Sequence, residues 1–461
     1  MKAVLVSVVA LFMSLALLVS GSAMLGTLIA LRLDMENVPE LLLGVVMAFY
    51  SGGFVLGAIY GVNVIRKVGH IRAFAVFAAL ACATTLAHPL FISVPAWALM
   101  RLLVGFCLAG LMTVTESWIN DRATNESRGK LLGIYTINFY FASAVGQMLV
   151  GFGSPMEFVA YSVVAMLIVL SLVPLALTQS LIPTAPSTTE SMGWSRLLKM
   201  APAGTTGALA SGVALGGFAA MAPVYALKAG LDVTLVARYM GFSVLCAVLL
   251  QWPAGWLSDR WGRLPVLTVL LFSGALAALG TALLGGASLY AMFLFSGALY
   301  ALATGMYPVS VALTNDQLPN DQLVAACAGM LRTYGVGTMV GPLVGAAMMG
   351  IFGHAALFVF IGLALLLSGI AVQYLFRASD EVPLEDQGEY VSVGPVTTPV
   401  LMELDPRNEE FEEHHPGEPA EWDLADKLEM LVIDPEQIEP LPEQEEEAAA
   451  GAEDGPPDEG R

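Results

Sequence analysis

Two arginines lie inside long apolar stretches of the sequence, where a guanidinium is costly unless a partner neutralises it. Arg332 is about ten residues into the stretch 323–350, and Arg101 is about six residues into the stretch 96–118. At about 1.5 Å of helix rise per residue, these positions are about 15 Å and about 9 Å deep in a bilayer. Arginine binds carboxylate and phosphate through its planar fork. We therefore expect an anionic ligand, with Arg332 as its main contact.

Each arginine also has a structural interpretation. Arg332 could bind carbonyl groups freed near Pro342 or at another helix kink, and Arg101 could extend outward to the membrane surface. For Arg101 we favour this structural role, although it remains a candidate ligand contact. No acidic residue occupies the middle of an apolar stretch, so neither arginine has an obvious internal carboxylate partner.

Polar residues near the middle of other apolar stretches could line the same cavity. Tyr300, Thr304 and Tyr307 follow an i, i+4, i+7 spacing, which places them on one helix face. Four further candidates come from two other stretches: Asn138, Tyr140, Gln147 and Tyr334. Each of these residues taken alone is more often an inter-helix hydrogen-bonding residue than a ligand contact.

A short charged loop follows the stretch 234–257 and combines one acid with two bases. It reads Gly255-Trp-Leu-Ser-Asp259-Arg260-Trp-Gly262-Arg263. Its glycines permit a tight turn and a close approach of helices. The loop could act as a gate, with Asp259 as its central residue, or it could be a solvated loop that follows the usual Lys/Arg bias.

Two acids near the end of the stretch 96–118 have open roles. Glu116 is the one acid of the apolar body that can lie within a stretch, so it could couple proton movement. It could equally be solvated near the mouth of the bundle. Asp121 follows in a polar loop, where it could contribute to a gate or cap the next helix.

The composition requires these residues to be positioned by membrane helices. Of the 461 residues, 57% are hydrophobic and 13% are charged, whereas soluble domains have about 25% charged residues. Continuous apolar runs of about 20 residues favour helices over barrel strands. Twelve such stretches are present: 4–31, 41–64, 71–93, 96–118, 130–152, 157–178, 203–227, 234–257, 266–285, 288–313, 323–350 and 355–376.

The Lys/Arg distribution predicts the orientation of these helices. With a cytoplasmic N-terminus, twelve basic residues of the short loops and ends lie on the cytoplasmic side and three on the other. An even number of spans then makes both termini cytoplasmic. We expect a multi-pass membrane protein.

The body repeats itself at an offset near 195. Asn120-Asp121 corresponds to Asn315-Asp316, Gly69 to Gly262 and Gly146 to Gly341. We expect an all-α polytopic fold of twelve transmembrane helices in two pseudo-symmetric six-helix halves with a disordered acidic C-terminal tail. The predicted domains are 1–178, the linker 179–202 with a surface helix near Trp194, 203–377, and the tail 378–461.

The tail has 27 acidic and three basic residues, a composition that cannot fold alone and that repels nucleic acid. Its segment 421–434 has helical spacing of apolar residues and could dock on a partner, but a solvated tail is the interpretation we favour.

Several chemistries lack their sequence motifs. The four cysteines match no zinc or redox spacing, and the chain contains neither a G-x-x-x-x-G-K-[ST] loop nor H-E-x-x-H. We therefore expect no cofactor, no metal and no enzymatic activity.

Four motifs together resemble the major facilitator superfamily over residues 1–377. The loop from Gly255 to Arg263 matches its G-x-x-x-D-R-x-G-R signature. Arg101-x-x-x-Gly105 and the run Gly337-Thr-Met-Val-Gly341-Pro342 resemble its arginine–glycine and glycine–proline motifs. The segments 116–125 and 66–72 look like the bacterial YcaD-type branch. One departure is Arg66, which stands where the first half of the signature would place its acid.

The resemblance implies a secondary transporter of the bacterial inner membrane that works by alternating access, with Asp259 locking the outward-facing state. Its partners would be the lipid bilayer and a small-molecule substrate, with a proton or counter-substrate, and we expect a monomer. Within this class, movement of an anionic metabolite competes with efflux of amphipathic drugs. A non-transporting sensor acting through the acidic tail is the alternative from a different class.

Overall fold

The computed structural model describes residues 2–121, 123, 127–176, 191–319 and 322–376, together with Gln387 and Gly394. The chain divides into two units, 1–414 and 415–461, and all described residues belong to the first. Apart from Gln387 and Gly394, the predicted tail lies outside the described residues, as do residues 179–190 of the predicted linker and residues 122, 124 and 125 of the motif 116–125.

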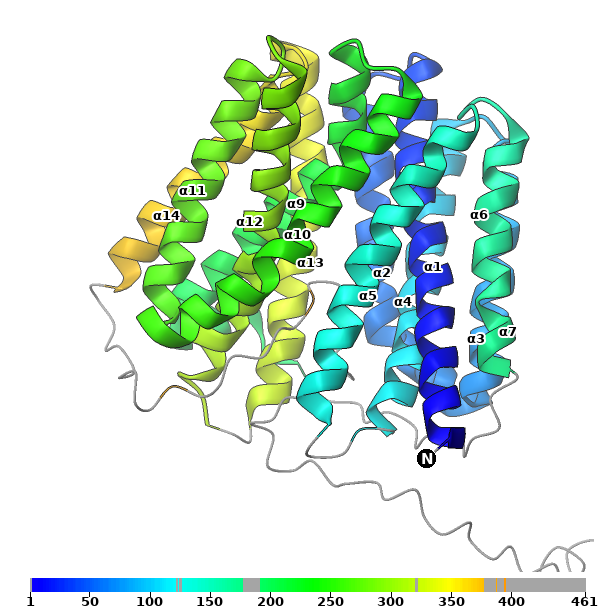
Figure 1. The fold of residues 1–461 in the computed structure, drawn as a ribbon, viewed down its shortest axis with the longest axis horizontal. Coiled ribbons are helices and arrows are strands. Elements are labelled where there is room, and N and C mark those ends of the chain that lie inside the picture. Colours follow the sequence, from blue (N-terminus) through cyan, green and yellow to red (C-terminus); the bar gives the residue numbers. More distant parts are fainter. Residues whose placement is uncertain are drawn as a thin grey trace, which may run out of the picture. The chain divides into compact units, whose positions relative to one another are not determined.

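The described residues form helices and no strand, which confirms the predicted all-α membrane fold (Figure 1). The first group of helices comprises α1 (Lys2–Met35), α2 (Glu40–Val68), α3 (His70–Ala87), α4 (Val94–Asp121), α5 (Arg128–Leu149), the short η1 (Val150–Phe152), α6 (Phe158–Leu170) and α7 (Leu172–Ala176). The second group comprises α8 (Trp194–Met200), α9 (Pro202–Lys228), α10 (Val233–Trp261), α11 (Arg263–Leu284), α12 (Leu289–Asn315), α13 (Leu323–Phe352) and α14 (Ala356–Phe376).

Within the described ranges, 11 helical segments are long and apolar enough to cross a membrane. In that set α6 and α7 count as one segment, Phe158–Ala176. The remaining long helix, α5, has 22 residues and is less apolar because it carries Asn138, Ser143 and Gln147. These polar residues have partners inside the protein or face its cavity, so α5 fits the bundle despite its lower hydropathy.

Successive long helices alternate in direction, which defines two faces of the bundle. We call the end at which α1 begins the N-terminal face, and the other end the opposite face (Figure 1). The loop between α10 and α11 and the short helix α8 are at the N-terminal face. The turns that join α1 to α2 and α9 to α10 are at the opposite face.

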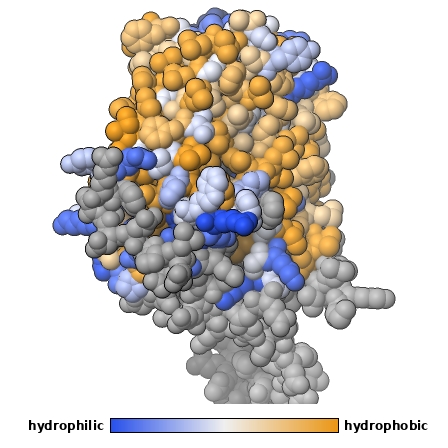
Figure 2. Space-filling view, turned by 60° about the vertical axis from the view of Figure 1, so that its left-hand side comes forward, coloured by the Kyte–Doolittle hydropathy of each residue, from blue (hydrophilic) through white to orange (hydrophobic). Residues whose placement is uncertain are grey.

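The sides of the bundle expose many large apolar side chains, as the hydropathy of the visible surface shows (Figure 2). Leu249, Leu276 and Leu283 are 76%, 70% and 77% exposed. Apolar patches of this extent are rare on water-soluble monomers. Lipid chains are the environment that such surfaces fit.

Glycines at matching positions of the two groups allow the same close helix packing. A Cβ on Gly146 of α5 would overlap the carbonyl oxygen of Ser20 on α1, and a Cβ on Gly341 of α13 would overlap that of Val213 on α9. These two glycines are partners in the repeat predicted from the sequence. Backbone contact of this kind is the packing mode of small residues in membrane helices.

A second repeat pair shares an unusual backbone conformation. Gly69, between α2 and α3, has φ 84°, and Gly262, between α10 and α11, has φ 90°. Residues with a Cβ rarely adopt this region. Both loops at the N-terminal face therefore turn in the same way.

Helix α8 is tied to the start of α13. Leu197 is fully buried and would touch a Cβ on Gly329, and the Met192 amide donates a 2.8 Å hydrogen bond to the Ala325 carbonyl. Arg196 donates a 3.0 Å hydrogen bond to the Gln322 side chain. The amphipathic pattern around Trp194 thus forms a helix that packs on the bundle through Leu197 and Met200.

Candidate functional site

A cavity of about 490 Å³ lies between the two helix groups. Its lining comes from α1, α2, α4 and α5 of the first group and from α9, α10, α12 and α13 of the second. Within the described part of the chain, that lining includes two arginines, Arg101 and Arg332, and no aspartate, glutamate, lysine or histidine. Aromatic rings contribute much of the wall: Tyr50, Phe54, Tyr60, Phe139, Tyr140, Tyr300 and Tyr334.

Arg101 faces this cavity from α4. Its side chain is 3% exposed, and its guanidinium carbon lies 4.3 Å from the centroid of the Tyr50 ring. The outward position expected for Arg101 is not observed. A Cβ on Gly105 would overlap the Tyr50 carbonyl, so α4 packs directly on α2 and turns Arg101 inward.

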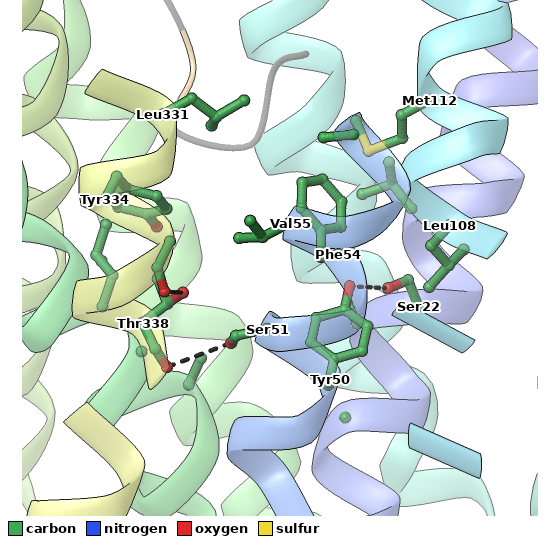
Figure 3. Close-up of a pocket in the computed structure, with 18 of the residues that line it drawn as sticks. Ser22, Tyr50, Ser51, Phe54, Val55, Leu108, Met112, Leu331, Tyr334 and Thr338 are labelled. Carbon is green, nitrogen blue, oxygen red and sulfur yellow. Dashed lines mark hydrogen bonds between the residues drawn. The ribbon is translucent and has the colours of Figure 1, made fainter. Parts of the chain in front are cut away.

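Tyr50 is itself held in place at the cavity wall. Its hydroxyl forms a 3.3 Å hydrogen bond with the Ser22 hydroxyl of α1, and its ring lies 6.4 Å from that of Phe54 (Figure 3). The Arg101 Nε atom is buried and has no hydrogen-bond partner among the described residues. Arg101 therefore packs against the face of the Tyr50 ring, and its Nε–H group donates no hydrogen bond to the described residues.

Arg332 lines the cavity from α13, and its side chain is exposed. Six residues further along α13, the Thr338 carbonyl accepts a 3.2 Å hydrogen bond from the Ser51 hydroxyl of α2 (Figure 3). Arg332 is therefore about 9 Å closer to the N-terminal face than this contact. Within the described chain no hydrogen bond joins it to a carbonyl near Pro342, so the structural interpretation of Arg332 has no support.

Most of the polar residues expected in the cavity are in its wall. Tyr140, Tyr300, Thr304 and Tyr334 line it, as does Gln147. The Tyr140 hydroxyl accepts a 3.3 Å hydrogen bond from Gln251 on α10, which links the two groups.

Two residues of the predicted set are outside the lining. The Asn138 amide donates a 3.1 Å hydrogen bond to the Phe12 carbonyl of α1. Tyr307 is fully buried, with its ring 5.0 Å from that of Tyr334. Both residues therefore make contacts between helices instead of lining the cavity.

The cavity is closed toward the opposite face. There, Pro342 of α13 lies directly against Gly44 of α2, and within the first group Thr27 of α1 donates a 2.6 Å hydrogen bond to Gln147 of α5. At the other end the lining residues Asn63 and Arg332 are exposed. The space therefore opens toward the N-terminal face.

Three charged residues to which the sequence assigns no role help to close the opposite face. Lys228 Nζ, at the end of α9, lies 2.8 Å from Glu40 Oε1 and 3.2 Å from Asp34 Oδ1. Helix packing adds to this contact, because a Cβ on Gly44 of α2 would touch Pro342 and Ala346 of α13. The signal in the sequence was one lysine and two acids in loops on the same side of the predicted bundle.

The predicted gate loop is held by a buried arginine. Arg263 is 1% exposed and donates hydrogen bonds of 2.6 Å to Asp259 and 3.1 Å to Ser258. It also donates a 3.2 Å hydrogen bond to Asp316, which is 3% exposed and follows α12. Arg260 instead lies 5.1 Å from the Trp256 ring centroid. Gly262 supplies the turn, and Gly255 lies within the last turns of α10.

Glu116 is fully buried near the end of α4 and does not line the cavity. Its Oε1 accepts a 2.5 Å hydrogen bond from the Tyr135 hydroxyl of α5. The solvated interpretation of Glu116 is therefore wrong, because α5 covers the carboxylate. Asp121 is the last residue of α4, at the N-terminal face.

A helical membrane body with a closed-ended cavity between two helix groups is the architecture of membrane transporters. The family model of the Major Facilitator Superfamily matches residues 11–305 and 239–402. The chain belongs to this superfamily.

Similar proteins agree with this assignment. An uncharacterized MFS-type transporter of Enterobacter sp. strain 638 is 29% identical over 356 residues, covering 77% of this chain and 92% of its own. The uncharacterized MFS-type transporter YcaD of Salmonella heidelberg is 29% identical over 378 residues, covering 82% and 97%. The YcaD resemblance seen in the sequence motifs is thus confirmed.

Two solved structures show the same fold. The nucleoside transporter NupG has a TM-score of 0.66 at 13% identity, covering 82% of this chain and 100% of NupG. A bacterial homologue of the human lysosomal transporter Spinster has a TM-score of 0.67 at 15% identity, covering 83% and 97%. At these identities the likeness concerns the fold alone.

Proposed function

We propose that this protein is a secondary active transporter that moves a small organic anion across the bacterial inner membrane. The observation that carries the proposal is the charge of the cavity, whose described lining has Arg101 and Arg332 but no carboxylate. A cation in a low-dielectric site is stabilised by an opposite charge. A volume of about 490 Å³ is in the range of small-molecule sites.

In this proposal the cavity serves alternating access. The Lys/Arg bias makes the N-terminal face cytoplasmic, so the present state is inward-open and both termini are cytoplasmic. Residues 1–178 and 203–377 rock against each other as two domains. Opening the outer side requires separation of Lys228 from Glu40 and Asp34, and the loop from Gly255 to Arg263 closes the cytoplasmic side. A monomer contains the complete pathway.

We assign the coupling of transport to its driving force to Glu116 of α4, which accepts a hydrogen bond from Tyr135 of α5. A buried carboxylate that can gain or lose a proton changes its interactions with its neighbours. We propose that this change is transmitted through the packing of α4 on α2, and that a proton or a counter-substrate supplies the driving force.

Efflux of amphipathic compounds is a second candidate, favoured by the aromatic wall that includes Phe54 and Phe139. The two candidates differ in the charge of the molecule that they require. Aromatic rings alone accept neutral and cationic amphiphiles, whereas two arginines without an acid disfavour cations.

The test is a thermal-shift screen of the purified full-length protein against a metabolite library, followed by transport in proteoliposomes. A ligand that binds only the folded state raises the apparent melting temperature. We expect organic anions to raise it and to cross the membrane. Binding without transport would favour a sensor, and stabilisation by cations alone would favour drug efflux.

A further inference from the structure

Arg101 and Arg332 line the same cavity but lie in different surroundings. Arg101 is 3% exposed, with its guanidinium over Tyr50, whereas Arg332 is exposed. Water and salt screen the charge of an exposed arginine, and burial removes that screening. An anion that reaches Arg101 would therefore be held more firmly than one at Arg332.

The two arginines also differ in depth. The contact between Ser51 and Thr338 joins α2 to α13 beside Tyr50, and Arg332 lies six residues before Thr338. That separation is about 9 Å along the helix. Arg101 is thus at the closed end of the cavity and Arg332 is on the side of its mouth.

Arg101 is a buried cation with little polar contact from the described residues. The described residues offer it no carboxylate, its Nε atom is buried without a hydrogen-bond partner, and its guanidinium lies over the Tyr50 ring. A buried cation normally has a partner that neutralises it. From Tyr50 toward the mouth of the cavity, the wall includes the apolar side chains of Phe54, Leu108 and Met112 (Figure 3).

We propose that Arg101, positioned by Tyr50, binds the acidic group of the substrate at the closed end of the cavity. Arg332 attracts the same group at the mouth but is not its main contact. The substrate class that fits is an organic monoanion with an apolar body, which lies along the wall of Phe54, Leu108 and Met112. This inference rests on the proposed function and reverses the roles that the sequence suggested for the two arginines.

Tyr50 acts as a positioning residue in this arrangement. Its ring face holds the guanidinium, so phenylalanine at this position preserves the cation–π contact and loses only the bond to Ser22. Leucine removes the contact. Tyr50→Phe should therefore keep anion binding within about threefold of wild type, and Tyr50→Leu should weaken it by more than the phenylalanine variant does.

The experiment uses purified full-length protein and a defined panel of ligands. Naphthalene-2-carboxylate and octanoate serve as anions, 2-naphthylmethanol as the neutral analogue and 2-naphthylmethylamine as the cation. Binding is followed by thermal shift and calorimetry in 50 mM and 500 mM NaCl. The variants are Arg101→Gln, Arg101→Lys and Arg332→Gln. Arg238→Gln is the matched control, because Arg238 is exposed on α10 and outside the cavity lining.

We expect the anions alone to bind the wild type, with at least tenfold weaker binding in Arg101→Gln at both salt concentrations. Arg101→Lys keeps the charge without the fork and should fall between these values. Arg332→Gln should weaken binding less than threefold, and high salt should remove that difference. Arg238→Gln should bind as the wild type does.

Three results would overturn the inference. A tenfold loss in Arg332→Gln with little loss in both Arg101 variants would move the anion site to the mouth and leave the proposed function intact. Equal binding of the neutral and cationic analogues would refute both the anchor and the anionic substrate. Failure of every anion to bind the wild type would refute the assigned ligand class. If Arg101→Gln does not fold, Arg101→Lys and Tyr50→Leu decide the matter.

Discussion

Lys228 Nζ, at the end of α9, lies 2.8 Å from Glu40 Oε1 at the start of α2, 188 residues earlier in the chain. Asp34, at the end of α1, is the second acid of this cluster, at 3.2 Å. The lysine belongs to the second helix group and both acids belong to the first. If the two groups separate at the opposite face, these ion pairs must break.

Replacement of Lys228 by alanine should therefore shift the protein toward a state that is open at the opposite face. Exposed ion pairs contribute about 0.2–1 kcal/mol each, so the open population should rise several-fold. A cysteine introduced at Ser51, which lines the cavity, can be labelled with an impermeant thiol reagent applied from that face. Labelling should be faster in Lys228→Ala.

The control for this measurement is Arg32→Ala. Arg32 forms a 2.7 Å pair with Glu36 near the same face, but both residues belong to the first group. Removal of this pair should leave the labelling rate at Ser51 unchanged. Equal rates in Lys228→Ala and the parent protein would show that the cluster does not hold the face closed.

Arg263 is expected to stabilise the fold more than any single acid of the predicted gate. Removing it leaves Asp316, which is 3% exposed, without its arginine, and losing one partner of a buried pair costs about 3–5 kcal/mol. Asp259 is 47% exposed, so Asp259→Ala should cost no more than about 1 kcal/mol. Thermal unfolding of the detergent-solubilised variants measures the difference. A larger loss in Asp259→Ala than in Arg263→Ala would contradict this ranking.

The same loop gives a functional prediction. Asp259→Asn should insert into the membrane normally and lower the transport rate, because the gate loses the charge that Arg263 holds. The rate in proteoliposomes, compared with wild type at matched protein density, is the measurement. An unchanged rate would leave Asp259 with a structural role only.

The helices and most of the cavity wall could be predicted from the sequence because membrane spans are long and apolar, and because polar residues within them are few. Periodicity placed Tyr300 and Thr304 on the face that lines the cavity. It placed Tyr307 there as well, although Tyr307 lies behind Tyr334. A helical pattern gives a broad face and does not show where a neighbouring helix covers it.

Contacts between helices that are distant in the sequence could not be predicted from its periodicity. Arg101 turns inward because Gly105 lets α4 pack on Tyr50 of α2, and no local pattern reveals that approach. Lys228 and Glu40 meet only because the two helix groups close at the opposite face. Pairing across 188 residues depends on how the two helix groups pack against each other.

Glu116 and Tyr135 allow a structural role to be separated from proton coupling. Tyr135→Phe removes the 2.5 Å hydrogen bond to a buried carboxylate, so it should lower stability by about 1–3 kcal/mol. Glu116→Gln keeps the shape of the side chain but cannot ionise. If Glu116 couples proton movement, transport in Glu116→Gln should lose its dependence on a pH gradient and retain exchange of substrate. Retained pH-gradient drive in a folded Glu116→Gln protein would exclude this role.

Two glycines of α5 provide a test of the predicted repeat. A Cβ on Gly146 would overlap the Ser20 carbonyl, whereas a Cβ on Gly133 meets nothing within 4 Å. Gly146→Ala should therefore force α1 and α5 apart, at a cost of about 1–3 kcal/mol. Gly133→Ala should stabilise the helix by about 0.5–1 kcal/mol.

Gly341 is the counterpart of Gly146, and a Cβ there would overlap the Val213 carbonyl of α9. Gly341→Ala should then lower the melting temperature about as much as Gly146→Ala does. A neutral Gly341→Ala beside a damaging Gly146→Ala would show that the two halves do not share this contact.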